Sequence, residues 1–319
     1  MSDPKPTPAP NRIVRAFNAL WQNPIVVKEL RSRMRRRRSY VILTVYLVLV
    51  AGITSLVYFG IASANEFYPD PDLRRTLGQA IFATVVLLQL TAINFVSPAF
   101  TAGSISSERE NQTYDLLRTT PVSAGDIVRG KFLSGLLFML LLLIASMPVQ
   151  SMAFLFGGIE LPEFLISSLM LLVTAITFSA IGIYFSSLLK RSTPATVLAY
   201  VVSNSAIFGL PILLFIVGIF FPASIDLFDL DFQEPNLVWT IILIAIGWVF
   251  LSSNPVSAAI ISEGLLLEDN ALFLYKLDLT NKTDIYILSP WIGFVTINLL
   301  IAWFFYRKAI KRVARKDKK

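Results

Sequence analysis

The residue types that do most of the chemistry in proteins are missing or scarce in this sequence. Its 319 residues include no Cys and no His. These two absences exclude a thiolate nucleophile, an imidazole base, a disulfide and the usual structural zinc sites. An intramembrane enzyme is also disfavoured, because no pair of Asp residues falls at membrane depth. We therefore expect a protein that is not itself catalytic and that binds no metal or cofactor.

One short segment matches half of a nucleotide-binding motif. Residues 125–131 read GDIVRGK, which satisfies the G-x-x-x-x-G-K part of a phosphate-binding loop. The next residue is Phe132, so the Ser or Thr hydroxyl that would hold Mg²⁺ is missing. No predicted strand precedes the loop either. We expect that this chain does not bind ATP, and that any ATP and Mg²⁺ are bound by another subunit.

The composition indicates that a lipid bilayer surrounds most of the chain. Charged residues make up 15% of the sequence and hydrophobic residues 55%, whereas soluble proteins have about 25% charged residues. The mean hydropathy is +0.66. Seven stretches have about the 20 apolar residues that a spanning helix needs. They cover residues 40–62, 77–102, 132–156, 164–189, 195–221, 238–261 and 285–306.

The positions of the basic residues predict the topology. Ten Lys and Arg precede Tyr40 and eight follow Tyr306, and such residues are retained on the cytoplasmic side of a membrane. Both termini are therefore expected in the cytoplasm, which requires an even number of spans. The weakest candidate is 238–261, because Asn254 and Pro255 interrupt it. We predict an all-α polytopic bundle with six spans in the cytoplasmic (plasma) membrane, in which 238–261 is a broken or re-entrant outer segment.

This topology divides the chain into three parts. Residues 1–39 form a cytoplasmic tail and an interfacial elbow helix, and 307–319 form a basic cytoplasmic tail. The transmembrane domain covers 40–306, with a cytoplasmic loop at 103–131 and an outer region at 222–284. The arginine cluster before the first span suits anionic lipid headgroups, and without aromatic stacking residues it predicts no nucleic-acid binding.

The polar residues inside the predicted spans are neutral. No Asp, Glu, Lys or Arg lies at the centre of a span, whereas ion-coupled carriers usually need one there. The neutral side chains can bond across helices. Alternatively they line a substrate path, for which Gln89, Asn94 and Asn204 are the first candidates. An ion-coupled secondary carrier and a non-transporting membrane scaffold stay open as alternatives to an ATP-driven transporter.

Two further patterns in the spans predict local structure. Ala175, Ser179, Gly182 and Ser186 follow one another at spacings of four, three and four residues, which predicts that another helix backbone approaches closely there. Pro148 and Pro211 predict kinks in the third and fifth spans.

The cytoplasmic loop between the second and third spans contains two helix starts. Ser107 and Glu110 have the spacing of a capping box, which predicts a helix that ends before Pro121. Ser123, with Asp126 in the following first turn, predicts a second helix that merges with the third span. The first helix would be amphipathic. Its apolar face would carry Thr113, Leu116, Leu117 and Thr120, and its charged residues would be Glu108, Arg109, Glu110, Asp115 and Arg118. Such a helix could simply lie on its own bundle.

At this loop the sequence resembles a known family. The segments NPIVVKELRSRMRRRRSY from residue 23, SERENQTYDLLRTTPVS from residue 107 and IVRGKF from residue 127 are similar to permease subunits of type-2 ABC transporters. The resemblance implies that the loop carries a coupling helix, which docks into a groove of a separate cytosolic ATPase. The docking element would include Glu108, Glu110, Thr113, Leu116, Leu117 and Pro121, with Gly130 and Lys131 at the following elbow. Relatives commonly carry Gly where this chain has Gln112.

The resemblance also implies a function and partners. The chain would be the membrane-spanning subunit of an ATP-driven exporter, surrounded by membrane lipids. Its partners would be cytosolic ABC ATPase subunits, which bind ATP and Mg²⁺, and a second permease chain in a homodimer or heterodimer. The residues expected to couple to the ATPase are Glu108, Arg109, Glu110, Thr113, Asp115, Leu116, Leu117, Arg118 and Pro121.

Overall fold

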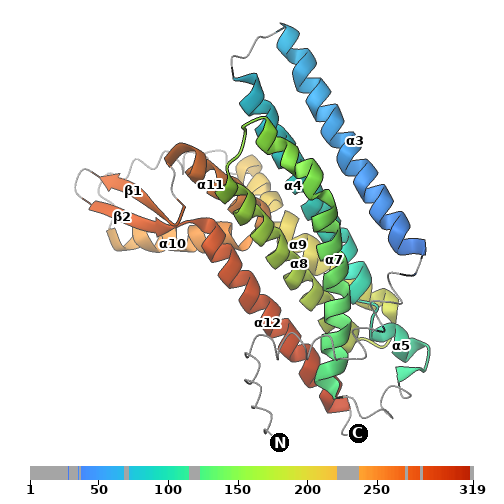
Figure 1. Ribbon diagram of the computed structural model, residues 1–319. Coiled ribbons are helices and arrows are strands. Elements are labelled where there is room, and N and C mark those ends of the chain that lie inside the picture. The colour runs from blue at the N-terminus through green and yellow to red at the C-terminus, as the bar shows by residue number, and fades with distance from the viewer. Residues whose placement is uncertain are drawn as a thin grey trace, which may run out of the picture.

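Long apolar helices make up almost all of the described part of the chain (Figure 1). The computed structural model describes residues 28, 35, 37–67, 72–114, 123–220, 237–269, 272–280 and 283–316. Its elements are α3 (Arg37–Phe67), α4 (Leu73–Thr101), α5 (Ser106–Glu110), α7 (Ala124–Leu155), α8 (Leu161–Leu188), α9 (Ser192–Phe220), α10 (Leu237–Ser253), α11 (Pro255–Asp269), β1 (Leu274–Thr280), β2 (Thr283–Leu288) and α12 (Pro290–Lys316).

Six of the described helices are long and apolar enough to cross a membrane, namely α3, α4, α7, α8, α9 and α12. The pair α10 and α11 is bent by 112° at its break and forms a broken span or a re-entrant loop. In Figure 1, α10 projects sideways from the bundle together with the strands. The prediction of an all-α polytopic membrane bundle is confirmed, and the predicted break at Asn254 and Pro255 separates α10 from α11. The predicted interfacial elbow helix lies largely outside the described residues.

Helix α8 is the centre of the bundle. It contacts α4, α7, α9, α11 and α12, and side chains such as Phe178 and Ile183 are completely or almost completely buried. A capping box begins the helix: the Glu160 amide donates to Glu163 Oε2 at 3.0 Å, and Pro162 lies in the first turn. Because apolar residues lie on every face of α8, it suits the interior of a helical bundle or a lipid membrane.

The small residues of α8 face α4. The Oγ atoms of Ser179 and Ser97 lie 2.9 Å apart, and a Cβ atom added at Gly182 would overlap Oγ1 of Thr101. The predicted close helix contact is therefore confirmed, and its partner is α4. The part of this contact at Thr101 lies near the end of the bundle that carries α5.

The break between α10 and α11 is held by one side chain. Asn254 is 1% exposed, and its Oδ1 accepts the amides of Val256 at 2.9 Å and Ser257 at 3.1 Å, so it caps α11. Its Nδ2 donates to the carbonyl of Ile207 in α9 at 2.7 Å. Pro211 lies inside α9 and has no N–H to reach this carbonyl four residues back. Asn254 therefore bonds the carbonyl that the proline frees.

The last predicted span needs a correction at its start. Residues 283–288 form strand β2, which pairs with β1 in an antiparallel hairpin from Leu274↔Leu288 to Thr280↔Thr283, so α12 begins at Pro290 rather than at Ile285. The sequence TDIYIL has the alternation and β-branched residues of a strand, and proline suits the first turn of a helix. Helix α12 then continues through the basic residues to Lys316.

Candidate coupling site

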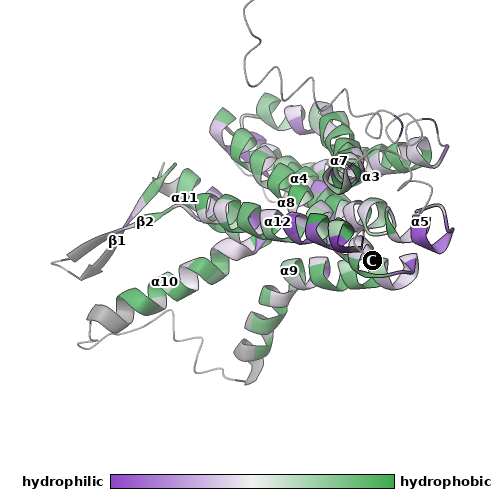
Figure 2. Ribbon diagram, turned by 90° about the horizontal axis from the view of Figure 1, so that it is seen from below, coloured by the Kyte–Doolittle hydropathy of each residue, from purple (hydrophilic) through white to green (hydrophobic). Residues whose placement is uncertain are grey.

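Helix α5 lies at the same end of the bundle as the starts of α7 and α9 and the end of α12 (Figure 1). Figure 2, which views this end, shows hydrophilic residues on α5 and on the last part of α12. The predicted second helix start is confirmed here. Ser123 Oγ accepts the Asp126 amide at 3.1 Å, and α7 runs without interruption from Ala124 into the bundle.

The predicted first helix of the loop is wrong in its length. Helix α5 ends at Glu110, and Gln112 has a φ of 58°. The Thr113 amide donates to the Glu108 carbonyl at 2.9 Å, and the Gln112 amide donates to the Arg109 carbonyl at 3.2 Å. These two bonds form a Schellman motif, which ends a helix and favours Gly at the position of Gln112. The continuous amphipathic helix expected from Ser107 to Thr120 is therefore interrupted.

The predicted capping box at Ser107 is also absent. Helix α5 begins at Ser106, and no side chain of its N-cap residue, Ile105, caps it. Instead, the amides of Ile105 and Ser106 donate to Ser186 Oγ of α8 at 2.8 and 3.0 Å. A long-range contact, rather than a local motif, thus satisfies the first free amides of the helix.

Glu108 joins α5 to α7. The Lys131 ammonium lies 2.7 Å from Glu108 Oε1 and 2.8 Å from the Ser104 carbonyl. Lys131 is 2% exposed, while the Glu108 side chain is 20% exposed. The lysine of the G-x-x-x-x-G-K segment therefore neutralises a carboxylate within its own chain. A buried charge of this kind is stable only with a partner.

Arg109 joins α5 to the end of α8. Its Nη1 donates to the Ser187 carbonyl at 2.8 Å, and this carbonyl belongs to the last turn of α8, where carbonyls lack helical partners. The positive charge also suits the negative end of the helix dipole. The guanidinium lies over the ring of Tyr114, with 4.9 Å between Cζ and the ring centroid.

Glu110 joins α5 to the start of α9. Its Oε2 accepts the Ser192 amide at 3.1 Å and the Ser192 hydroxyl at 2.6 Å. The carboxylate thus bonds free donors at the positive end of α9. Three consecutive charged residues, Glu108, Arg109 and Glu110, therefore each hold a different helix of the bundle.

An apolar cluster packs next to the polar contacts of α5. It combines side chains from the α5 region, α7, α8 and the end of α12. Its buried members are Ile105, Tyr114, Val128, Ile183, Ala309 and Val313. Burial of these apolar side chains stabilises the position of α5, and with it the polar contacts of α5. Helix α5 is therefore part of the bundle rather than a loop beside it.

A comparison with protein families finds a match that includes this segment. A family model described as "ABC-2 family transporter protein" matches residues 23–225, which is more than half of the chain. The chain belongs to this family. It is therefore a multi-pass membrane component of an ABC transporter, and its family associates with ABC ATPases. No match is found among curated proteins.

The structure describes only some of the predicted coupling residues. Glu108, Arg109 and Glu110 bond to the bundle, while Thr113 is exposed. The remaining predicted residues lie outside the described part of the chain, namely Asp115, Leu116, Leu117, Arg118 and Pro121. Sequence reasoning missed Ser187 and Ser192 as partners, because nothing local marks a carbonyl or hydroxyl that a residue about 80 positions away will bind.

The residues predicted to line a substrate path do not all contact one another. Gln89 Nε2 donates to Ser146 Oγ of α7 at 2.7 Å, and Gln89 lines a cavity of about 220 Å³. Asn94 Nδ2 donates to Asn204 Oδ1 of α9 at 3.0 Å. Gln89 therefore faces α7, whereas Asn94 and Asn204 form a separate contact between α4 and α9.

Proposed function

We propose that this chain is the permease subunit of an ABC exporter and that a separate cytosolic ATPase drives it through residues 107–121. One observation supports this most. Three consecutive residues of the loop, Glu108, Arg109 and Glu110, each bond to a different helix. A protein that pushes on α5 must therefore move α7, α8 and α9 with it.

The path of the force follows from the connection between α4 and α5. Only residues 102–105 separate the two helices, and the amide of Ile105 is bonded to Ser186 in α8. Closure of the ATPase subunits would tilt α4 and α7 against α8 and switch access from one membrane face to the other. In this scheme both termini are cytoplasmic, as the basic residues predict.

Three buried polar atoms at α5 favour a rearrangement on docking. Glu108 Oε2, Arg109 Nη2 and Tyr114 Oη have no hydrogen-bond partner among the described residues. A buried polar atom without a partner costs about 1–3 kcal/mol. A docked ATPase that shifts α5 can supply partners for these atoms, so part of the docking free energy comes from relieving this cost.

A second permease chain completes the proposed transporter. In the most apolar part of α3 and of α9, only 17% of the residues are buried inside the structure, whereas the corresponding share in α8 is 56%. The exposed apolar faces of α3 and α9 suit lipid and a homodimeric or heterodimeric partner. In this proposal Gln89, Asn94 and Asn204 lie along or beside the path, and ATP and Mg²⁺ are bound by the ATPase alone, because Lys131 is already paired with Glu108.

Association with an ATPase tests the proposal. The full chain would be co-expressed with a candidate cytosolic ABC ATPase and purified through a tag on the chain. We expect co-purification, and we expect its loss when Leu116 and Leu117 are both changed to Asp. The matched control changes the same two residues to Ile and should retain the ATPase. Unchanged association of the Asp variant, with a normal gel-filtration profile, would contradict the proposal.

A further inference from the structure

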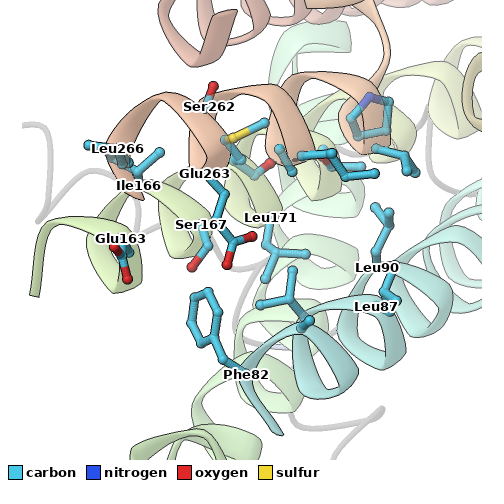
Figure 3. Close-up of a pocket in the computed structure, with 18 residues that line it drawn as sticks. Phe82, Leu87, Leu90, Glu163, Ile166, Ser167, Leu171, Ser262, Glu263 and Leu266 are labelled. Atoms are coloured by element: carbon cyan, nitrogen blue, oxygen red, sulfur yellow. Dashed lines mark hydrogen bonds between the residues drawn. The ribbon is translucent and has the colours of Figure 1, made fainter. Parts of the chain in front are cut away.

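A cavity of about 310 Å³ lies between α4, α8 and α11 (Figure 3). Its walls are mostly apolar and include Phe82, Val86, Leu90, Ile166, Leu171 and Val256. Two of its lining residues, Leu87 and Ile260, are 53% and 64% exposed. The cavity can therefore be reached from outside the bundle, and it belongs neither to the coupling site nor to the contacts of Gln89 and Asn94.

Two carboxylates line the same cavity. Glu163 comes from the start of α8 and is 8% exposed, and Glu263 comes from α11. Figure 3 shows both near Ser167 and Phe82, with Leu87 and Leu90 at the other end. The two carboxylates are close enough to interact electrostatically. The cavity thus has an acidic end and an apolar end.

The protein itself does little to compensate these charges. Glu163 accepts the Glu160 amide, but no hydrogen bond or ion pair reaches the Glu263 carboxylate from any residue that the structure describes. The hydroxyls in the lining have other roles. Ser167 and Thr174 donate to carbonyls of their own helix, and Ser262 accepts the Trp291 amide.

Few nearby positive charges oppose the carboxylates at the acidic end. Arg75 attracts Glu163, but it is exposed and no ion pair joins the two within the described residues. Glu160 adds a third carboxylate beside Glu163. Like charges in apolar surroundings are unfavourable unless a cation or a proton compensates them. A cation bound in the cavity would compensate the charges of these carboxylates.

We propose that this cavity binds a compact amphipathic cation, such as a single-chain alkylamine. The ammonium group lies against Glu163 and Glu263, and the apolar body extends toward Leu87 and Leu90. Ligand cavities are usually about 300–1,000 Å³, so this cavity, at the small end of the range, does not enclose a two-chain phospholipid. The proposal concerns a binding site and does not depend on the ATPase or on the direction of transport.

Calorimetric titration of the full chain in phosphatidylcholine nanodiscs tests the proposal. The probes are octylamine, octanol and octanoate, which share one chain length and differ in charge, and empty nanodiscs correct for partition into lipid. We expect octylamine to bind at least about 10-fold more tightly than the other two, because only its charged group complements the carboxylates. Equal binding of the three probes would overturn the proposal.

Variants of the cavity make the test specific. The double change Glu163→Gln and Glu263→Gln should abolish the preference for octylamine, whereas Glu263→Asp, which keeps the charge, should retain it. Ala259→Phe should reduce binding of all three probes by filling the cavity. A preference for octylamine that persists in the double variant would overturn the proposal.

Two further measurements check the folding of the variants and the size of the ligand. Thermal unfolding shows whether each variant is folded, and co-purification with the ATPase is expected to be unchanged in all of them. Replacing phosphatidylcholine with phosphatidylethanolamine should leave octylamine binding within about twofold, since the lipid is too large for the cavity. Strong competition of phosphatidylethanolamine with octylamine would show that the acidic end binds a lipid headgroup. This result would overturn the proposal of a compact ligand.

Discussion

The Lys131 ammonium of α7 lies 2.7 Å from the Glu108 carboxylate of α5, and the lysine is 2% exposed. The pair joins the candidate coupling element to a helix that crosses the bundle. It also gives the lysine of the nucleotide-like motif a structural role. Because the ammonium is buried, its stability depends on the carboxylate that it meets.

Removal of one partner of this pair should be costly. Glu108→Gln leaves the Lys131 charge without its counter-charge and should destabilise the chain by about 3 kcal/mol. The double change Glu108→Leu and Lys131→Met should restore most of this stability. Thermal unfolding in detergent measures both. Arg129→Gln is the control, since Arg129 forms an exposed 3.8 Å pair with Asp126 and should cost less than about 0.5 kcal/mol. Equal losses for Glu108→Gln and Arg129→Gln would contradict the structural role of the buried pair.

The left-handed backbone at Gln112 predicts a stabilising substitution. A non-glycine residue at a φ of 58° is strained, so Gln112→Gly should stabilise the chain by about 0.5–1 kcal/mol after the entropy of the unfolded state is included. Asn111 has a φ of −84°, and Asn111→Gly should give no gain. A rise in the unfolding temperature for the first variant alone is expected. A rise for both, or for neither, would contradict the Schellman motif.

Asn254 and Pro211 should be energetically coupled. Asn254→Asp keeps an acceptor for the amides of α11 but cannot donate to the Ile207 carbonyl, so it should cost about 1–2 kcal/mol. In a Pro211→Ala background, the restored N–H can bond that carbonyl, and the same change should cost less. A double-mutant cycle by thermal unfolding should give a coupling of about 1 kcal/mol. Additive effects would show that the two residues do not share this carbonyl.

Close packing of α8 on α4 predicts a position-specific effect of added methyl groups. Gly182→Ala places a Cβ against Thr101 and should destabilise the bundle by about 1–3 kcal/mol. Gly209→Ala is the control, because nothing lies within 4 Å of its added Cβ, and it should be neutral or stabilising. Unfolding temperatures that change equally in both variants would argue against the close contact.

Much of the fold could be predicted because it follows from local patterns. Six of the seven apolar stretches correspond to helices long enough to span a membrane. Asn254 and Pro255 predict the broken segment, and the spacing from Ala175 to Ser186 predicts the close contact of α8. Each of these features depends on residues that are near one another in the sequence.

The features that sequence reasoning missed depend on distant contacts or on competing local signals. The strand at 283–288 overlaps the start of the apolar stretch 285–306, although its alternation is visible in the sequence. The apparent capping box at Ser107 is replaced by Ser186, which lies in another helix. The cavity with Glu163 and Glu263 could not be predicted, because only the bend at Asn254 brings α11 against α8.

Site-specific cross-linking tests the central claim most directly. The chain has no Cys, so a single Thr113→Cys substitution places one reactive group on the exposed side of the coupling site. Tyr286→Cys places another in the hairpin, where Tyr286 is 65% exposed. With a co-expressed ATPase and a short bifunctional thiol-to-amine reagent, position 113 should cross-link to the ATPase and position 286 should not. Cross-linking from position 286 but not from position 113 would contradict the account.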